Sequence, residues 1–234
     1  MATIHRGRIP PAIRTMLDAA VRRDYPEFMI RIALISLTTA FCALADQDLP
    51  VPAQTAPPDV IESAVAAVRD LGEEVVLGRY HVAIERMNPM WKNRAARRAG
   101  GMAALEQQLQ DVGRQMVRQG VSVISSRPQG DPRVFEVRPS RETRTEDGET
   151  VEEMVYREWL IFVPTVTKYR IMMEGEPRPV VIESTGFQIA VSAKNPLEWS
   201  FIDGSSVTVN DLRSMFRTLP QDLELPPIER REAR

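Results

Sequence analysis

Few side chains in this sequence could move a proton between substrate atoms, and His81 is the first of them. The chain has two histidines in 234 residues. On a helix, His81 would share a face with Ile84 and Glu85, and a carboxylate one turn away could orient an imidazole as a general base. A single helical histidine beside aliphatic residues is more often a hydrogen-bonded residue at the edge of a core. No motif around His81 decides between these interpretations.

Asp203 is the second candidate for proton transfer. It lies in the segment Ile-Asp-Gly-Ser-Ser at 202–206. Such a segment is typical of a turn in which the aspartate accepts hydrogen bonds from its own backbone, and we favour this turn role. No residue is therefore assigned as catalytic, and His81 and Asp203 are kept as candidates.

Aromatic and basic residues suggest binding rather than catalysis. Four aromatic side chains could line a pocket and stack on an apolar ligand: Tyr156, Trp159, Tyr169 and Trp199. Aromatic residues in strands more often form the core of a sheet. Arg94, Arg97 and Arg98 could bind an anion or an acidic partner, although arginines on a short helix more often form a solvated face.

The motifs of the common enzyme classes are absent from the sequence. It contains no GxSxG, no Walker A loop, no GxGxxG after a predicted strand and no HExxH. The usual hydrolase, NTPase, dinucleotide-binding and zinc-protease classes therefore lack their minimum residues. Adjacent carboxylates such as Glu73-Glu74 and Glu152-Glu153 point in different directions, so they do not form an acid–base pair. We expect no metal and no cofactor.

Composition and charge restrict the class of protein. Hydrophobic residues make up 43% and charged residues 26% of the chain, which is typical of a soluble globular protein. The 30 basic and 32 acidic residues leave no basic excess to neutralise a phosphate backbone. We therefore expect one sizeable domain with appendages and no nucleic-acid partner.

An uncharged stretch near the start of the chain has the pattern of a secretory signal peptide. The 14 residues from Ile32 to Ala45 follow Arg31 and end in small residues before Asp46. A spanning helix needs about 20 residues, so a permanent membrane anchor is the weaker interpretation. We predict cleavage after Ala45 and a periplasmic or secreted product with no stable membrane span.

Two other features bear on the processing of this segment. We take Met29 as the start of translation, because a chain that begins there has a signal peptide of ordinary length, and residues 1–28 then need not be translated. Cys42 could be a lipidation site, but Phe41 stands where lipoprotein motifs have a small residue.

Cleavage after Ala45 would leave a mildly acidic protein with 24 basic and 29 acidic side chains, a net charge of −5. It would also leave no cysteine, because Cys42 is the only one. Disulfides and cysteine chemistry are thereby excluded for the mature protein. With His81 the only remaining histidine, a multi-histidine zinc site within one chain is excluded too.

Four segments follow from these patterns. Residues 1–45 are the N-terminal extension and signal peptide, and residues 46–58 form a proline-rich linker. Residues 59–219 form the folded domain. Residues 220–234 are a tail of prolines and charges that we expect to be extended and then frayed.

The domain is predicted to begin with helices. Asp59, with Glu62 three positions later, is typical of an N-cap. Apolar residues at three- and four-residue spacing then predict one helix from Val60 to Met87, ended by Asn88-Pro89. A second helix is predicted from Met102 to Gly120.

Beyond Gly120 the hydrophobic period changes from 3.6 to 2, which predicts a sheet. The predicted strands are Val121–Ser126, Val134–Arg138, Met154–Ile171, Val180–Ala193 and Leu197–Ile202. Short connections predict an antiparallel meander, with a bend at Pro164. The charged segment Pro139–Glu153 is predicted as a loop that contains a hairpin turn at Asp147-Gly148. A last helix is predicted at Val209–Phe216, capped by Thr208.

This order of elements resembles the nuclear-transport-factor-2-like cone fold, the group that includes ketosteroid isomerase and scytalone dehydratase. The resemblance covers most of residues 58–218. It includes EWSFIDG at Glu198–Gly204, which is similar to the terminal strand of exported members. The match is architectural and includes no enzyme motif.

The resemblance implies an α+β domain in which N-terminal helices pack on a strongly curved antiparallel sheet. It also implies a pocket between the helices and the concave face of the sheet. By the same analogy, an acidic residue such as Asp203 would transfer protons in an enzyme of this group.

Three hypotheses of function follow. The first is an exported, non-catalytic domain that binds a small apolar molecule or an envelope protein. The second is a metal-free enzyme of the isomerase or dehydratase kind, which would use His81, Asp203 or a tyrosine that faces the pocket. The third is a structural or assembly domain that forms a homodimer through its sheet.

Overall fold

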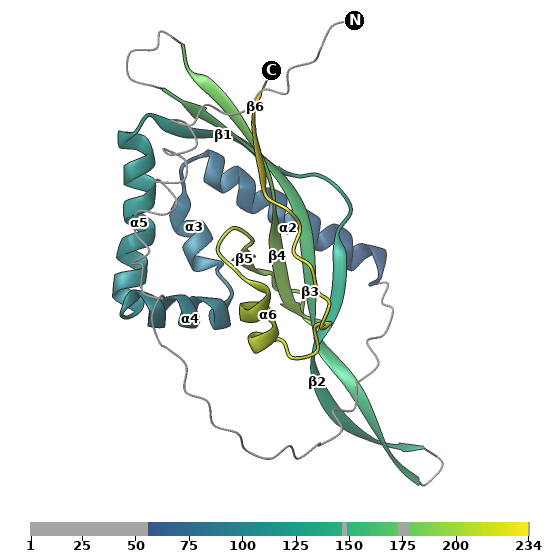
Figure 1. The fold of residues 1–234 in the computed structure, drawn as a ribbon. Coiled ribbons are helices and arrows are strands. Elements are labelled where there is room, and N and C mark those ends of the chain that lie inside the picture. Colours follow the sequence, from purple (N-terminus) through teal and green to yellow (C-terminus); the bar gives the residue numbers. More distant parts are fainter. Residues whose placement is uncertain (1–55, 147–148, 173–177, 234) are drawn as a thin grey trace, which may run out of the picture.

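The chain is an α+β domain with an antiparallel sheet, as predicted, and this sheet has six strands where five were predicted (Figure 1). The computed structural model describes residues 56–146, 149–172 and 178–233, so the predicted signal peptide, most of the linker and the predicted turn at 147–148 lie outside the described residues. The helices are α2 (Pro58–Val76), α3 (Tyr80–Glu85), α4 (Pro89–Ala99), α5 (Met102–Arg118) and α6 (Val209–Met215). The strands are β1 (Val121–Pro128), β2 (Arg133–Glu146), β3 (Glu149–Ile171), β4 (Val180–Ala193), β5 (Ser200–Asp203) and β6 (Glu229–Glu232).

The first predicted helix is two helices, α2 and α3. Gly78 separates them with a φ of 74°, a left-handed conformation that ends a helix. The prediction of one helix was therefore wrong. The sequence pattern did not reveal the break, because the apolar spacing continues across it. The predicted Asp59 cap was also wrong, because α2 begins at Pro58 with Pro57 as N-cap. Proline suits the first helical position, where an N–H would have no partner.

Helices α4 and α5 begin and end at residues suited to these positions. The Asn88 side chain caps α4 by accepting hydrogen bonds from the backbone N–H groups of Met90, at 3.1 Å, and Trp91, at 3.4 Å. Gly100, with a φ of 90°, ends α4. Helix α5 begins at Met102 as predicted and ends two residues before Gly120.

The long strand β3 organises the sheet. It pairs with β4 along one edge, while β1 and β2 share the other edge, β1 beside residues 165–171 and β2 beside residues 149–162. The gap between β1 and β2 lies at Pro164, which has no N–H for the ladder and whose carbonyl accepts a hydrogen bond from Gln129 at 2.9 Å. Because β1 pairs with β3 and not with β2, the sheet is not a simple meander.

The predicted loop Pro139–Glu153 is mostly strand. Here β2 and β3 continue as a two-stranded ribbon that projects from the body of the domain (Figure 1). Ion pairs link the ribbon strands, between Arg157 and Glu142 at 2.5 Å and between Arg141 and Glu152 at 3.6 Å. The ribbon carries charges on both faces and packs on no core, so it lacks the apolar alternation that identifies a strand.

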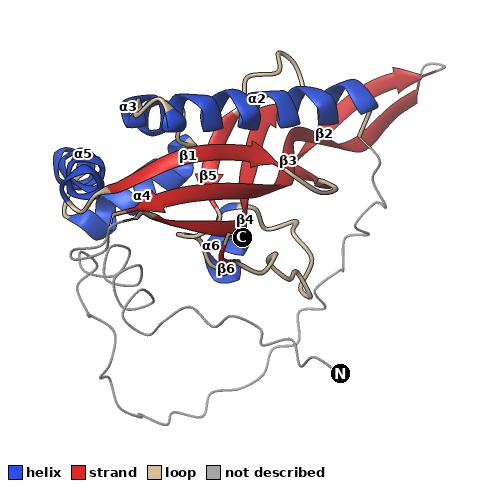
Figure 2. Ribbon diagram, turned by 90° about the horizontal axis from the view of Figure 1, so that it is seen from above, coloured by secondary structure: helices blue, strands red, loops and turns tan. Residues whose placement is uncertain are grey.

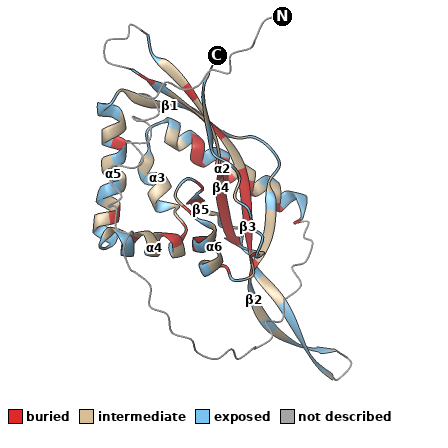
Figure 3. Ribbon diagram, in the orientation of Figure 1, coloured by how far each residue is buried: buried red, intermediate tan, exposed pale blue. Residues whose placement is uncertain are grey.

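Both faces of the central sheet are covered (Figure 2). On one face Ile161 packs under α2, together with Ala64 and Leu71. On the other face Phe162 packs against the α6 residue Leu212 and against Phe216 just beyond α6. Consecutive β3 residues point to opposite faces, so both of these neighbours are fully buried, and the buried residues concentrate in the middle of β3 and β4 (Figure 3).

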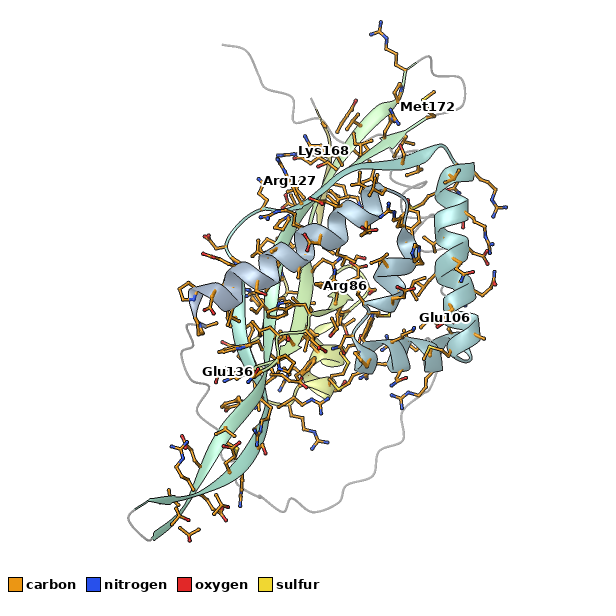
Figure 4. All side chains as sticks on the ribbon, turned by 180° about the vertical axis from the view of Figure 1, so that it is seen from behind. Arg86, Glu106, Arg127, Glu136, Lys168 and Met172 are labelled. Atoms are coloured by element: carbon orange, nitrogen blue, oxygen red, sulfur yellow. The ribbon has the colours of Figure 1, made fainter. Side chains whose placement is uncertain are left out.

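The C-terminal helix follows the prediction, whereas the tail does not. Helix α6 is capped by Thr208, which forms a reciprocal capping box with Asp211. The tail ends in β6, which pairs with residues 182–185 of β4, so the predicted frayed end was wrong. Glu183 holds β6 in place through Arg231, with Nε 3.0 Å from Oε1. Glu183 also pairs at 3.4 Å with Lys168, which is labelled in Figure 4.

Candidate functional site

A cavity of about 450 Å³ lies between the helices and the sheet. Residues of α2, α3, α4 and α5 line one side, and residues of β1, β3, β4, β5 and β6 line the other. The helices, with Met87 between α3 and α4, supply an apolar wall that includes Val68, Leu71, Val75, Ile84, Leu109 and Met116. This volume and lining are typical of small-molecule sites in proteins.

Two glycines allow the helices around the cavity to pack closely. A Cβ on Gly72 would lie 2.6 Å from the backbone oxygen of Ser126, so α2 rests directly on β1. A Cβ on Gly113 would lie 2.7 Å from the Tyr80 ring, so this ring rests directly on α5. Both glycines line the cavity, and their missing side chains set its width.

The segment between α3 and α4 ties the helices to β5. Backbone hydrogen bonds of 2.8 Å run from Phe201 N to Arg86 O and from Asn88 N to Phe201 O. The Arg86 guanidinium lies 4.7 Å from the centroid of the Phe201 ring (Figure 4). An ion pair of 3.2 Å between Lys92 and Glu106 joins α4 to α5, and Glu106 is labelled in Figure 4.

The sheet supplies a polar floor. Ser126, Thr167, Ser184 and Arg230 are consecutive partners in the register across β1, β3, β4 and β6, and all four line the cavity. The hydroxyls of Ser126 and Thr167 are hydrogen bonded at 3.1 Å. The cavity therefore has an apolar side and a polar side, which would orient a ligand that has both kinds of surface.

Asp203 ends β5 and lines the cavity. Its Oδ1 accepts hydrogen bonds from Ser205 N at 3.3 Å and from Gln188 Nε2 at 3.4 Å, and its Oδ2 accepts one from the Ser205 hydroxyl. The predicted turn contacts are thus present, and the same carboxylate faces the cavity. Asp203 is exposed by its accessible surface, although many protein atoms surround its carboxyl. Burial by the surrounding protein raises the pKa of Asp203, although the bonds from Ser205 and Gln188 partly oppose this shift.

Tyr169 on β3 also lines the cavity, beside Asp203. Burial raises the pKa of its phenol, and the negative charge of Asp203 raises it further. The positive charge of Arg230 acts in the opposite direction. The phenol therefore stays protonated at neutral pH and can donate a hydrogen bond into the cavity.

The other candidates from the sequence do not line this cavity. His81 is exposed on α3. Trp159 and Trp199 pack in the core under α2, where Trp199 Nε1 donates to Ser63 Oγ at 2.9 Å, and Tyr156 is half-buried on β3 near the ribbon. Of the four aromatic candidates, Tyr169 alone is among the residues that line it.

The arginine cluster of α4 was predicted as a solvated face, but two of its three arginines form ion pairs within the domain. Arg94 Nε lies 3.0 Å from the buried Asp211 carboxylate, and Arg98 pairs with the same carboxylate. These contacts fasten α6 to α4. Arg97 is exposed.

Sequence reasoning missed Tyr80, Gln188 and Arg230 as lining residues. Tyr80 lies in a segment whose break at Gly78 was not foreseen, and Arg230 lies in the tail that was predicted to fray. Gln188 was assigned only to an alternating strand. Its pairing with Asp203 depends on the register of β4 and β5, which the sequence does not specify.

Within residues 56–146, 149–172 and 178–233, the structure contains no cluster of histidine, cysteine or carboxylate side chains that could hold a metal ion. No helix in these ranges is long and apolar enough to cross a bilayer. Comparison of the chain with protein-family models, with curated proteins and with solved structures gives no match.

Proposed function

We propose that this chain is an exported, non-catalytic domain of the cone-fold type that binds a small, largely apolar molecule between its helices and its sheet. The observation that carries the proposal is the cavity of about 450 Å³ with aliphatic residues on the helix side. Export rests on the pattern at 32–45, and the fold type rests on the resemblance. Both are part of the proposal.

The distribution of polar groups supports a binding role. Hydroxyls, the Asp203 carboxyl and the guanidinium groups of Arg127 and Arg230 lie on the sheet side, so a ligand would place its polar group there and its hydrocarbon against the helices. Burying hydrocarbon against this wall contributes about 25 cal/mol per Å² of apolar surface.

A cavity-filling variant tests the proposal. Gly186 lies on β4 and faces the cavity, and a Cβ built there meets only Thr165 Oγ1, at 4.0 Å. Gly186→Leu would therefore extend its side chain into the cavity with little strain. Ala193→Leu, at the exposed end of the same strand, adds a comparable volume outside the cavity and serves as the control.

Titration with the uncharged fluorescent probe N-phenyl-1-naphthylamine gives the readout. We expect the wild-type protein and Ala193→Leu to bind one probe per chain, and Gly186→Leu to bind at least about tenfold more weakly, a change of about 1.4 kcal/mol. Equal binding by Gly186→Leu and Ala193→Leu, or no saturable binding by the wild type, would contradict a ligand site in this cavity.

A second candidate is a metal-free enzyme of the isomerase or dehydratase kind. The observation that favours it is the Asp203 carboxyl, which faces the cavity beside Tyr169 and has a raised pKa. His81 is exposed and does not line the cavity, so it is not part of this candidate. Deuterium incorporation beside the carbonyl of cyclohexanone in D₂O, lost in Asp203→Asn, would favour the enzyme over the binding domain.

A further inference from the structure

We propose that two copies of this chain pair edge to edge through the part of β2 that lies in the projecting ribbon. The paired segments would be residues 140–146 of each copy, antiparallel to each other, with a two-fold axis at Thr143. None of these residues lines the cavity, so the inference does not depend on the proposed binding function.

The outer edge of β2 is free in the ribbon. Among the strands that the structure describes, β2 pairs with β3 alone. Alternate residues of β2 therefore turn their backbone N–H and C=O groups away from β3, where another extended chain could bond to them. Because the ribbon projects from the body of the domain, a second chain could reach this edge (Figure 1).

The free edge is bounded at both ends. At the base of the ribbon Pro139 has no N–H, and Arg138 before it has a φ of 62°, so the regular edge ends there. At the tip, β2 ends at Glu146. The central residue of the segment 140–146 is Thr143. Two antiparallel copies of this segment therefore pair over their whole length only when the two-fold axis passes through Thr143.

The charges of the segment favour the same register. With the axis at Thr143, Glu142 of each copy lies opposite Arg144 of the other, and the two threonines lie opposite each other. Opposite charges and threonines in directly opposed positions stabilise a sheet, whereas like charges destabilise it. A shift of the axis by one residue would place Glu142 opposite Glu142, or Arg144 opposite Arg144. The length of the segment and its charges thus select one register independently.

Both charged residues also have partners in their own chain. Glu142 pairs with Arg157 of β3, and Arg144 interacts with another group. Contacts between the copies would extend these pairs into a network along one face of the ribbon. Charges on an edge strand commonly prevent pairing with other chains. Here their order opposes the neighbouring registers and matches the register at Thr143.

Two charge reversals and their mixture test this pairing. Arg144→Glu makes both charged positions acidic and Glu142→Arg makes both basic, so neither variant matches itself in the proposed register. The two variants match each other, because every acidic position then lies opposite a basic one. Arg141→Glu is the control. It reverses a charge on the same strand, but residue 141 would lie opposite Thr145 of the second copy.

Sedimentation equilibrium from about 5 to about 500 µM protein covers the weak association expected of an interface this small. We expect dimers of the wild-type protein and of Arg141→Glu. Arg144→Glu and Glu142→Arg should each dimerise at least about tenfold more weakly, and their equimolar mixture within about threefold of the wild type. All three variants should bind N-phenyl-1-naphthylamine as the wild type does, because the ribbon lies outside the cavity.

Three results would overturn the inference. A wild-type protein that stays monomeric over this whole range does not pair through β2. If both reversals dimerise as tightly as the wild type, the interface lies elsewhere. If the two reversals are monomeric alone and also when mixed, the substitutions disturb the ribbon itself and the register at Thr143 is wrong.

Discussion

Replacing Asp211 should destabilise the domain, although this residue lies outside the cavity. Its side chain is 6% exposed and receives Arg94 Nε at 3.0 Å and the Arg98 guanidinium. It also accepts hydrogen bonds from the N–H of Thr208 at 3.2 Å and from its hydroxyl at 2.8 Å. One carboxylate therefore caps α6 and fastens it to α4.

The expected loss follows from these contacts. A hydrogen bond to a charged group contributes about 1.5–3 kcal/mol, and a helix cap contributes about 1 kcal/mol. The side chains of Arg94 and Arg98 are 29% and 49% exposed, so water partly replaces their lost partner. We expect Asp211→Ala to lower the free energy of unfolding by about 2–4 kcal/mol, and Asp211→Asn by about half of that.

Urea denaturation followed by tryptophan fluorescence measures this difference. Asp111→Ala is a matched control, because Asp111 also pairs with an arginine, Arg114, with Nε at 3.1 Å, but lies on the surface of α5. We expect no measurable change for this control. If Asp211→Ala unfolds at the same urea concentration as Asp111→Ala, the argument from burial is refuted.

The stability that the Asp211 carboxylate contributes should depend on pH. Burial alone would raise the pKa of Asp211, but the hydrogen bonds from Arg98 and Thr208 outweigh burial and lower it. A carboxyl whose folded pKa is lowered stabilises the fold above its unfolded pKa of about 3.9, and this contribution is lost as the pH falls through the folded value. The difference in stability between wild type and Asp211→Asn should therefore shrink below about pH 4.

Two further variants test how β6 and α2 are held against the sheet. Glu183→Gln should weaken the attachment of β6, because hydrogen bonding by Arg231 and Lys168 lowers the pKa of Glu183 and keeps it charged. Amide hydrogen exchange should then become faster at residues 229–232 and stay unchanged at 188–191. The same change in rate at both segments would count against the attachment of β6 by Glu183. Gly72→Ala should cost about 1–3 kcal/mol by pushing α2 away from β1, reduced by about 1 kcal/mol of helix propensity, and a more stable variant would disprove the close contact.

The elements predicted best from the sequence are those in which the hydrophobic pattern and the residues at the two ends indicate the same bounds. Strand β4 has the predicted bounds, because it alternates between two buried faces and lies between turn residues. Helix α6 was predicted from its Thr208 cap. The ribbon of β2 and β3 was missed because both of its faces are solvated, and β6 was missed because Glu-Arg-Arg-Glu pairs through Glu183 and not through an apolar face.

The candidate site was predictable only in part. Asp203 and Tyr169 were singled out by residue type, and both line the cavity. The helical wall comes from four separate helices, so no local pattern identifies its members. The close contacts at Gly72 and Gly113 depend on how distant segments meet, and a lone glycine in a helical pattern does not reveal its neighbour.

Methyl NMR of methionine-labelled protein tests the central claim, that the cavity is a ligand site, most directly. Met87 and Met116 line the cavity, whereas Met154 lies on the exposed ribbon. On titration with N-phenyl-1-naphthylamine, we predict that the methyl signals of Met87 and Met116 shift and saturate together while that of Met154 stays in place. Saturating shifts at Met154, with Met87 and Met116 unmoved, would contradict the account.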